Sequence, residues 1–318
     1  MKNNKIVTIV QQPLTCRYTK EWYDVLSKKD DLLVLGANTI SDIDRTKSYN
    51  YFANLEGSIN YELDQIKELL FLDTIDKLLI TDLDFPGIAI QCIPLLRLKY
   101  PNMKVYAILH AGSWINGDIF SENGEKKNQE DYGINLCKTI FVSTDYHKKK
   151  IMKFSGYIGD RFIVMNGMYF NPKQLEQYKR IPKTKDILLL GRKEQSVNIK
   201  LDKYTIDIHD TLIPREEYLK LLASYKICII NKTDDTFGYG VVESAACGVI
   251  PFVPNKYSYS EWVPKQFIFA NKKELQDQIT ILLENYNTLK NVMYLDRFDL
   301  NKFSTFFDDV IKIIKKDN

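Results

Sequence analysis

Short runs of apolar residues alternate along the chain with longer segments in which apolar positions recur every three or four residues. The first pattern is typical of buried strands in a parallel sheet, and the second is typical of amphipathic helices. Their alternation predicts an α/β protein. In the first half we expect strands at 5–11, 32–36, 77–81, 105–110, 139–143 and 162–165, with helices at 61–72, 87–98 and 147–154.

The second half repeats the pattern after a stretch rich in Lys, residues 171–185, that also contains two prolines. We therefore predict two Rossmann-like, doubly wound domains facing each other across a cleft. Their expected bounds are 1–175 and 182–300, and residues 301–318 are expected to form a C-terminal helix that packs back on the N-terminal domain. Strands are expected at 186–190, 205–209, 227–231, 249–253 and 266–270, with helices at 214–224, 241–247, 272–284 and 301–315.

The composition is that of an ordinary globular protein, with 45% hydrophobic and 27% charged residues among 318. The 44 basic side chains nearly balance the 41 acidic ones, so no overall field demands a polyanionic partner. A local stripe is still available, because lysines cluster at 148–150 and between 173 and 185. Such runs are usually solvated faces, so they indicate a nucleic acid only together with other features.

The five cysteines are odd in number, widely spaced and without a CxxC pair, which indicates reduced thiols and gives no support to a structural zinc site. The first residues contain no apolar run of signal-peptide length. Apolar stretches elsewhere are strand-sized, well below the roughly 20 residues of a membrane span. We expect a cytoplasmic protein without stable membrane insertion.

The most informative stretch is 234–251, an acidic turn with glycines between a predicted strand and a short helix of small residues. Asp235 precedes Gly238 and Gly240, and Glu243 follows in the first turns of the helix. The first N–H groups of a helix are unpaired and favour anions such as phosphate. Two carboxylates around such a site suit hydroxyl groups of sugars on either side of a diphosphate. An ordinary βαβ turn with surface acids is the alternative.

This stretch resembles the donor motif of the family 4 retaining glycosyltransferases, which have the two-domain GT-B fold. In that motif two acids stand eight positions apart around a Gly-Phe-Gly turn, before a Glu-Ala-Met-Ala-Cys-Gly-like helix. Here Asp235 and Glu243 have this spacing, Phe237-Gly238 stands in the turn, and the helix reads Glu-Ser-Ala-Ala-Cys-Gly. Asp235 stands where the family usually has Glu, and Thr236 stands where it has the first Gly. Because Asp is shorter than Glu, the resemblance does not identify the donor sugar.

Three flanking segments fit the same family in the same order: 164–168, 186–192 ending in Gly-Arg192, and 213–229. The resemblance covers about residues 160–300, and the N-terminal half matches only in layout. It implies a nucleotide-sugar donor, most naturally a UDP-sugar, with no metal and no further cofactor. The donor-binding residues it implies are Arg192, Lys200, Asp235, Phe237, Gly238, Tyr239, Gly240 and Glu243.

The catalytic residues we expect are His110, Arg192 and Asp235. His110 ends a predicted strand beside a glycine, where it can donate a hydrogen bond to the sugar or the acceptor. Arg192 ends another strand and can neutralise the donor diphosphate. The resemblance implies transfer with retention, in which the leaving β-phosphate takes the acceptor proton and no general base is needed.

Several acceptors are compatible with the sequence. The stretch 242–251 also suits the bacteriophage DNA α-glucosyltransferases, which look like GT-B enzymes of similar layout. With the lysine clusters and a Lys-, Asn- and Ile-rich composition, this makes a hydroxymethylated DNA base the leading acceptor. Cell-surface glycans, lipids and tRNA are the alternatives.

Two other functions compete with this interpretation. Asp82 and Asp84 form a DxD at a strand end, and Asp42 and Asp44 form another, the pattern with which metal-dependent GT-A transferases hold a donor diphosphate. Such spacing arises easily among 41 acids and leaves 234–251 without a role. The second competitor is a non-catalytic nucleotide-sugar-binding protein.

Overall fold

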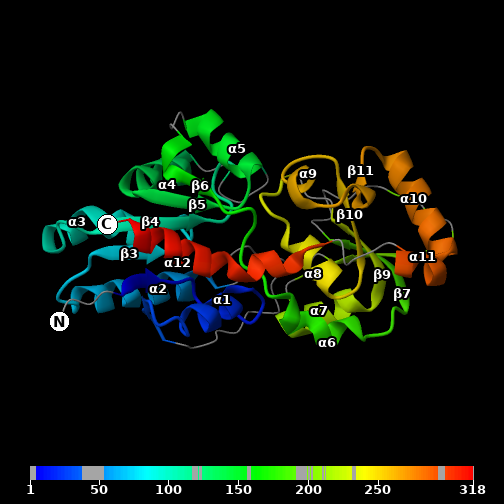
Figure 1. Ribbon diagram of the computed structural model, residues 1–318, viewed down its shortest axis with the longest axis horizontal. Coiled ribbons are helices and arrows are strands. Elements are labelled where there is room, and N and C mark those ends of the chain that lie inside the picture. The colour runs from blue at the N-terminus through cyan, green and yellow to red at the C-terminus, as the bar shows by residue number, and fades with distance from the viewer. Residues whose placement is uncertain are drawn as a thin grey trace. The chain divides into compact units, whose positions relative to one another are not determined.

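A computed structural model describes the chain in two compact units (Figure 1). The first contains residues 1–168 and 306–318, and the second contains 169–305. Among the described residues no helix is both long and apolar enough to cross a bilayer. The structure describes residues 5–37, 54–116, 121, 124–155, 159–190, 199, 201, 203–209, 211, 213–230, 234–292 and 298–317.

The first unit is built on a six-stranded sheet with the order β2-β1-β3-β4-β5-β6, and every strand pairing that the structure describes in it is parallel. The strands are almost entirely apolar because both faces of a parallel sheet are covered by helices. They are β1 (Ile6–Ile9), β2 (Leu32–Val34), β3 (Lys77–Ile80), β4 (Lys104–Leu109), β5 (Thr139–Val142) and β6 (Phe162–Val164).

The helices of this unit connect successive strands and cover the two faces. Right-handed crossovers send the β1–β2 connection to one face and the later connections to the other. Accordingly α2 contacts α3, and α3 contacts α4. The helices are α1 (Thr19–Leu26), α2 (Leu55–Leu70), α3 (Ile88–Lys99), α4 (Gly124–Leu136) and α5 (Asp145–Ser155).

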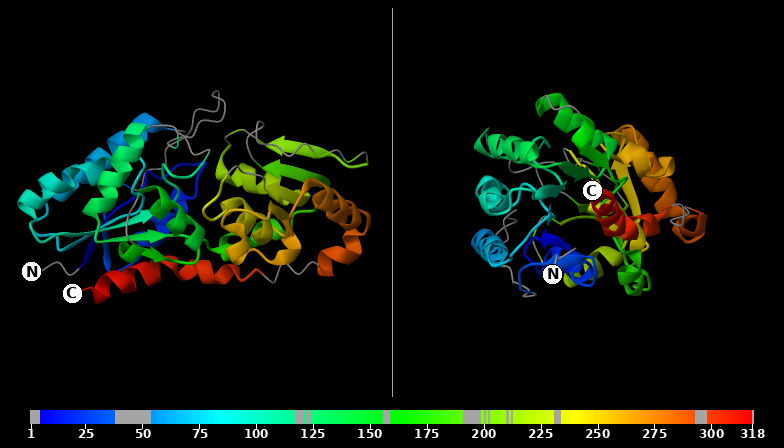
Figure 2. Two further views of the ribbon diagram at one scale, coloured as in Figure 1. Left: turned by 90° about the horizontal axis from the view of Figure 1, so that it is seen from above. Right: turned by 60° about the vertical axis from the view of Figure 1, so that its left-hand side comes forward.

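The C-terminal helix α12 (Phe306–Lys316) lies in the first unit, on the sheet face opposite α2 and α3 (Figure 2). Its Phe307 ring packs edge-on against Trp22 of α1, with ring centroids 5.2 Å apart. Lys77 of β3 donates to the Ile314 carbonyl at 2.9 Å. Helices α1 and α12 therefore cover this face of the sheet together, which α1 alone would cover only in part.

The second unit has a five-stranded sheet with the order β11-β10-β9-β7-β8, whose described pairings are again parallel. Its strands are β7 (Lys185–Leu190), β8 (Ile206–His209), β9 (Tyr225–Ile230), β10 (Ile250–Pro254) and β11 (Ile268–Phe269). Its helices are α6 (Glu176–Lys179), α7 (Arg215–Ala223), α8 (Tyr239–Ala246), α9 (Tyr259–Trp262), α10 (Lys272–Glu284) and α11 (Tyr286–Val292).

Each sheet has one point where the strand order reverses. In the first sheet the chain leaves β1 for β2 on one side and returns to β3 on the other. In the second it leaves β7 for β8 and returns to β9. Ligands of open α/β sheets bind outside the carboxyl ends of the strands at such a reversal. The loops after β1 and β3, and those after β7 and β9, are therefore the expected ligand-binding loops.

Candidate functional site

The turn after β9 leads into α8 and depends on two glycines. Gly238 has φ +92°, in the left-handed region, and a Cβ there would lie 2.9 Å from Cε1 of Tyr259. Gly240 lies in the first turn of α8, where a Cβ would meet Leu190 and Ile230 at 3.3 and 3.4 Å. The bare backbone thus brings the start of α8 against the ends of the two central strands, β7 and β9.

Asp235 lies at this turn and is 8% exposed. Its carboxylate accepts hydrogen bonds from the Tyr259 hydroxyl at 2.9 Å and from the Phe237 N–H at 3.3 Å. Burial, followed by the charge of Asp235, raises the pKa of Tyr259 well above its usual value, so Tyr259 is a firm hydrogen-bond donor. These two hydrogen bonds therefore fix the orientation of the Asp235 carboxylate.

Glu243, the second acid of the motif, lies in α8 and is 4% exposed. Arg215 donates from Nη1 to its Oε1 at 2.6 Å, and the Tyr218 hydroxyl donates to its Oε2 at 3.1 Å. Both partners come from α7, whose start follows β8. Burial and the Glu243 charge hold the pKa of Tyr218 well above its usual value. A carboxylate has about four acceptor positions, so capacity remains for hydroxyl groups of a ligand.

The two aromatic residues of the predicted donor set have structural contacts. Phe237 is fully buried, and its ring packs on Trp262 and Phe303 with centroids 5.2 and 5.0 Å apart. The ring therefore belongs to an aromatic core and is not exposed to a ligand. Tyr239 donates its hydroxyl to the Tyr169 carbonyl at 2.8 Å.

Arg192 and Lys200, which we predicted to hold the donor diphosphate, lie outside the described residues. The strand that leads to Arg192 is described: β7 ends at Leu190, beside the end of β9. In the sequence Arg192 follows Leu190 by two residues.

Arg215, Tyr218 and Tyr259 hold the two acids and were missed by the sequence analysis. A signal for the first two was present, since a buried carboxylate requires a cation or hydroxyl partner. Arg215 and Tyr218 stand three positions apart on a predicted helix, the spacing that puts side chains on one face. Nothing in the sequence pointed to Tyr259.

His110 follows β4 in the first unit and is partly exposed. Its Nδ1 is hydrogen-bonded to the hydroxyl of Tyr18, which lies just before α1. The two rings meet edge-on at 5.2 Å, and Trp22 lies 6.3 Å from the His110 ring. Tyr18 thus orients the imidazole just beyond the end of β4.

The DxD after β3 is enclosed rather than open. Asp82 and Asp84 are 7% and 9% exposed, and Gln11, after β1, donates its amide to Asp82. Burial and the neighbouring Asp84 charge raise the pKa of Asp82 well above its usual value. The described part of the chain contains no group of three or more His, Cys, Asp or Glu side chains arranged to hold a metal ion. Asp42 and Asp44 lie outside the described residues.

Two further buried acids anchor the loops at this edge. Glu62 of α2 accepts the Ile88 N–H at 2.9 Å at the start of α3, and Glu130 of α4 accepts the Ser113 N–H at 2.5 Å. Burial raises the pKa of Glu62 to about 7; burial and the Asp84 charge raise that of Glu130 to about 8. These acids shape the edge of the first sheet that His110 borders.

Solved structures of glycosyltransferases share this fold across almost the whole chain. Sucrose-phosphate synthase from Thermosynechococcus elongatus matches with a TM-score of 0.66 and 10% identity over 99% of this chain and 100% of that chain. Anabaena HepE in complex with UDP and glucose matches with a TM-score of 0.60 and 11% identity over 98% of this chain and 100% of that chain. A glycosyltransferase from Rickettsia africae matches with a TM-score of 0.55 and 14% identity over 99% of this chain and 100% of that chain. The two-sheet α/β architecture is therefore that of GT-B glycosyltransferase structures, as the sequence predicts.

Sequence comparison gives a narrower likeness. No family model matches the chain. A segment of 98 residues is 32% identical to the tRNA-queuosine alpha-mannosyltransferase of Drosophila melanogaster, which is 29% of this chain and 25% of that protein. The match thus spans about a quarter of the length of this curated relative.

Proposed function

We propose that the protein is a glycosyltransferase that takes a sugar from a nucleotide-sugar donor bound between the ends of β7 and β9. The observation that carries this proposal is the pair of buried acids Asp235 and Glu243, held on either side of a glycine turn at the start of α8. This pair lies at the reversal point of a sheet whose fold glycosyltransferases share, one of them in complex with UDP and glucose.

Each part of the turn has a distinct task toward such a donor. The N–H groups of residues 238–240 favour the negative diphosphate, since they open a helix and lack intrahelical partners. Arg192, beyond β7, supplies the compensating charge, with Lys200 as a second cation. Asp235 and Glu243 accept hydroxyl hydrogen bonds from the sugars that flank the diphosphate. Tyr239 holds the turn through its hydrogen bond to Tyr169. Gly240, which has no side chain, lets the backbone of the turn approach the strand ends closely.

The reaction that follows is transfer with retention. The bond from the anomeric carbon to the β-phosphate oxygen breaks, and a bond to the acceptor oxygen forms on the same face. The acceptor proton passes to the departing phosphate oxygen. Arg192 and the N–H groups of the turn stabilise the charge that develops on that phosphate. His110 donates a hydrogen bond to the sugar or the acceptor and so holds the two reactants in line.

The donor assignment is tested by incubating the protein with a panel of UDP- and GDP-sugars and measuring sugar release and transfer by mass spectrometry. We expect turnover of one donor by the parent and loss of turnover in Glu243→Gln. Lys272→Gln, an exposed change on α10, serves as the matched control. Failure of the parent to bind or turn over any nucleotide-sugar would remove this function and favour a different ligand at the turn.

For the acceptor we propose a hydroxyl group on a modified base of a nucleic acid. The sequence favours a hydroxymethylated base in DNA, through its likeness to bacteriophage DNA glucosyltransferases and its lysine clusters. The local match to a tRNA-queuosine mannosyltransferase favours tRNA instead. A base in a duplex must be flipped out to be reached, whereas a base in an RNA loop is already accessible.

The two acceptors are distinguished by nucleoside mass spectrometry after reaction with hydroxymethylated duplex DNA or with total tRNA. Added hexose on hydroxymethylcytosine would select DNA, and added hexose on a tRNA nucleoside would select tRNA. If neither carries hexose while a glycan or lipid extract does, the nucleic-acid acceptor is wrong and the donor assignment stands.

A further inference from the structure

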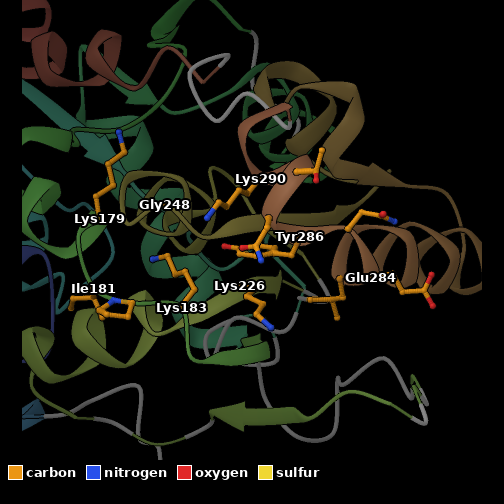
Figure 3. Close-up of a pocket in the computed structure, with 13 residues that line it drawn as sticks. Lys179, Ile181, Lys183, Lys226, Gly248, Glu284, Tyr286 and Lys290 are labelled. Carbon is orange, nitrogen blue, oxygen red and sulfur yellow. The ribbon is translucent and has the colours of Figure 1, made fainter.

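A pocket of about 780 Å³ opens at the opposite end of the second sheet from the donor turn (Figure 3). Its lining comes from the end of α6 and the segment before β7, the start of β9, the turn after α8 and the junction of α10 with α11. The donor turn follows β9, whereas Lys226 stands at its second position. A strand of six residues separates its two ends by about 17–20 Å, so this pocket is a separate site.

Four lysines line the pocket against one acid. They are Lys179, Lys183, Lys226 and Lys290, and the acid is Glu284. Lys226 is paired with Asp186 at 2.8 Å, and Glu284 lies 3.7 Å from Lys203. Lys179 and Lys290 are exposed, and neither forms an ion pair with any residue that the structure describes. The pocket therefore has an excess of positive charge.

Lys183 is the most enclosed of the four. Its ammonium group donates to the carbonyls of Ala223 and Cys247 at 2.6 and 2.7 Å, at the ends of α7 and α8. It has three protons, and these two bonds leave one for a further acceptor. Burial lowers its pKa to about 8, because no carboxylate within the described chain offsets the loss of water. An anion in the pocket would supply the missing compensation.

The remaining surface suits a phosphate carried on a nucleotide. Gly248, with φ +71°, gives the wall no side chain, and a Cβ there would lie 3.2 Å from Cγ of Lys179 and 3.8 Å from Nζ of Lys183. The half-buried ring of Tyr286 has the ammonium groups of Lys226 and Lys290 at 5.6 and 5.8 Å. An aromatic ring among lysines is the combination that binds backbone phosphate together with a base or ribose.

We propose that this lysine pocket binds backbone phosphate of a nucleic acid, and that it anchors the acceptor away from the donor turn. The proposal rests on the nucleic-acid acceptor proposed above. Lys179 and Lys290 contact phosphate oxygens through solvent-accessible ammonium groups, and Lys183 offers its free proton from the wall. Tyr286 stacks on a neighbouring base or ribose. The contact is to the backbone, so it contributes affinity and position but no base selectivity.

The test is the affinity of a short RNA hairpin, and of its DNA counterpart, between about 50 and about 200 mM salt. The variant is Lys179→Gln with Lys290→Gln, two exposed side chains whose removal leaves the carbonyl bonds of Lys183 intact. We expect hairpin binding to weaken about tenfold. Each lost phosphate contact also reduces the log–log salt slope by about 0.7 to 0.9.

The matched control is Lys272→Gln with Lys273→Gln, which removes the same charge at the opposite end of α10. We expect it to bind the hairpin as the parent does. Equal loss in both double variants would mean a general charge effect and would overturn the pocket, as would parent-like binding by Lys179→Gln/Lys290→Gln. If the parent binds pyrophosphate but neither hairpin, the nucleic-acid proposal is wrong and the pocket is a site for a small phosphorylated ligand.

Nucleotide-sugar binding separates this proposal from the proposed function. Both double variants should bind the UDP-sugar as the parent does, because Lys179 and Lys290 lie at the other end of the sheet, and Lys272 and Lys273 are exposed and form no part of the donor set. If the UDP-sugar binds and the pocket variant leaves hairpin affinity unchanged, only the pocket proposal fails. If no UDP-sugar binds to the parent, the proposed function fails whatever the hairpin shows.

Discussion

Arg215 Nη1 lies 2.6 Å from Glu243 Oε1, and the two side chains are 12% and 6% exposed. The pair joins the start of α7 to the helix of the donor motif. Burying a carboxylate removes its hydration, and the adjacent guanidinium of Arg215 offsets part of that loss. The ion pair also fixes which oxygens of Glu243 remain available to a sugar hydroxyl.

Replacing Arg215 by Met should therefore destabilise the second unit strongly, because it leaves a buried carboxylate without its cation. Breaking such a pair costs on the order of 3 kcal/mol. Urea unfolding of the intact protein measures the change. Arg180→Met, at an exposed arginine, should have little effect. Arg215→Met with Glu243→Leu should regain part of the loss, and a double variant as unstable as Arg215→Met alone would mean that the charge is not the cause.

Conservative changes at the two acids should act on the donor. Asp235→Asn and Glu243→Gln keep the shape of each side chain but remove the charge that strengthens hydrogen bonds to hydroxyl groups. A charge-assisted bond is worth about 1.5–3 kcal/mol, so donor affinity should fall roughly 10- to 100-fold. Calorimetric titration with the nucleotide-sugar measures this, and circular dichroism checks that the fold is kept. Parent-like affinity in both variants would place the donor elsewhere.

Much of the fold could be predicted from the sequence because a parallel sheet needs strands that are apolar on both faces. Each expected strand is present, although several are shorter; 5–11, for example, becomes Ile6–Ile9. Helix α4 was not predicted, since its sequence is dominated by charged and amide residues and only three of its residues, one of them a glycine, are buried. The helix expected at 301–315 begins instead with a 3₁₀ segment, Leu300–Thr305, before α12.

The candidate site could be predicted only in part. The spacing of Asp235 and Glu243 follows from the turn and the helix between them, which is local information. The partners Arg215 and Tyr259 come from separate segments, so their contacts depend on how α7 and α9 pack. Phe237 shows the limit of a motif: its position was predicted, but its burial in an aromatic cluster could not be read from neighbouring residues.

Gly238→Ala tests the backbone of the donor turn. A residue with a Cβ at φ +92° carries strain of roughly 1–3 kcal/mol, and the new methyl group would lie 2.9 Å from the Tyr259 ring. We expect lower stability and weaker donor binding, measured by urea unfolding and calorimetry. Gly124→Ala is the control, because a Cβ there meets nothing within 4 Å and the residue opens α4. Unchanged donor affinity in Gly238→Ala would show that the turn tolerates a side chain.

Transfer should not depend on a divalent cation, because Arg192 and backbone N–H groups suffice to hold a diphosphate. We expect the rate to be the same before and after treatment with EDTA. Asp82→Asn should also leave metal dependence unchanged, since this carboxyl is enclosed beside Asp84. Loss of activity on chelation, restored by Mn²⁺ in the parent but not in Asp82→Asn, would assign the DxD a metal role.

The stability of the first unit should fall as the pH rises from about 5 to about 8, through Glu130. Its usual pKa of 4.5 is raised to about 8 by burial and by the Asp84 charge. Between these values the folded protein keeps a proton that the unfolded chain has released, so raising the pH favours unfolding. The slope is at most about 1.4 kcal/mol per pH unit for this one proton. Glu62, whose pKa is raised to about 7, also lowers the stability as the pH rises toward that value. His147, whose pKa is lowered to about 4, has the opposite effect on stability.

Because other groups titrate in the same window, the measurement is a difference between two proteins. Glu130→Gln keeps an oxygen for the Ser113 N–H but cannot ionise. The free energy of unfolding of the parent minus that of Glu130→Gln should decrease from about pH 5 to about pH 8, as followed by urea titration at each pH. Glu56→Gln, at an exposed position in the first turn of α2, should show a far smaller change. A difference for Glu130→Gln that stays constant across this range would mean that the buried carboxyl is ionised throughout.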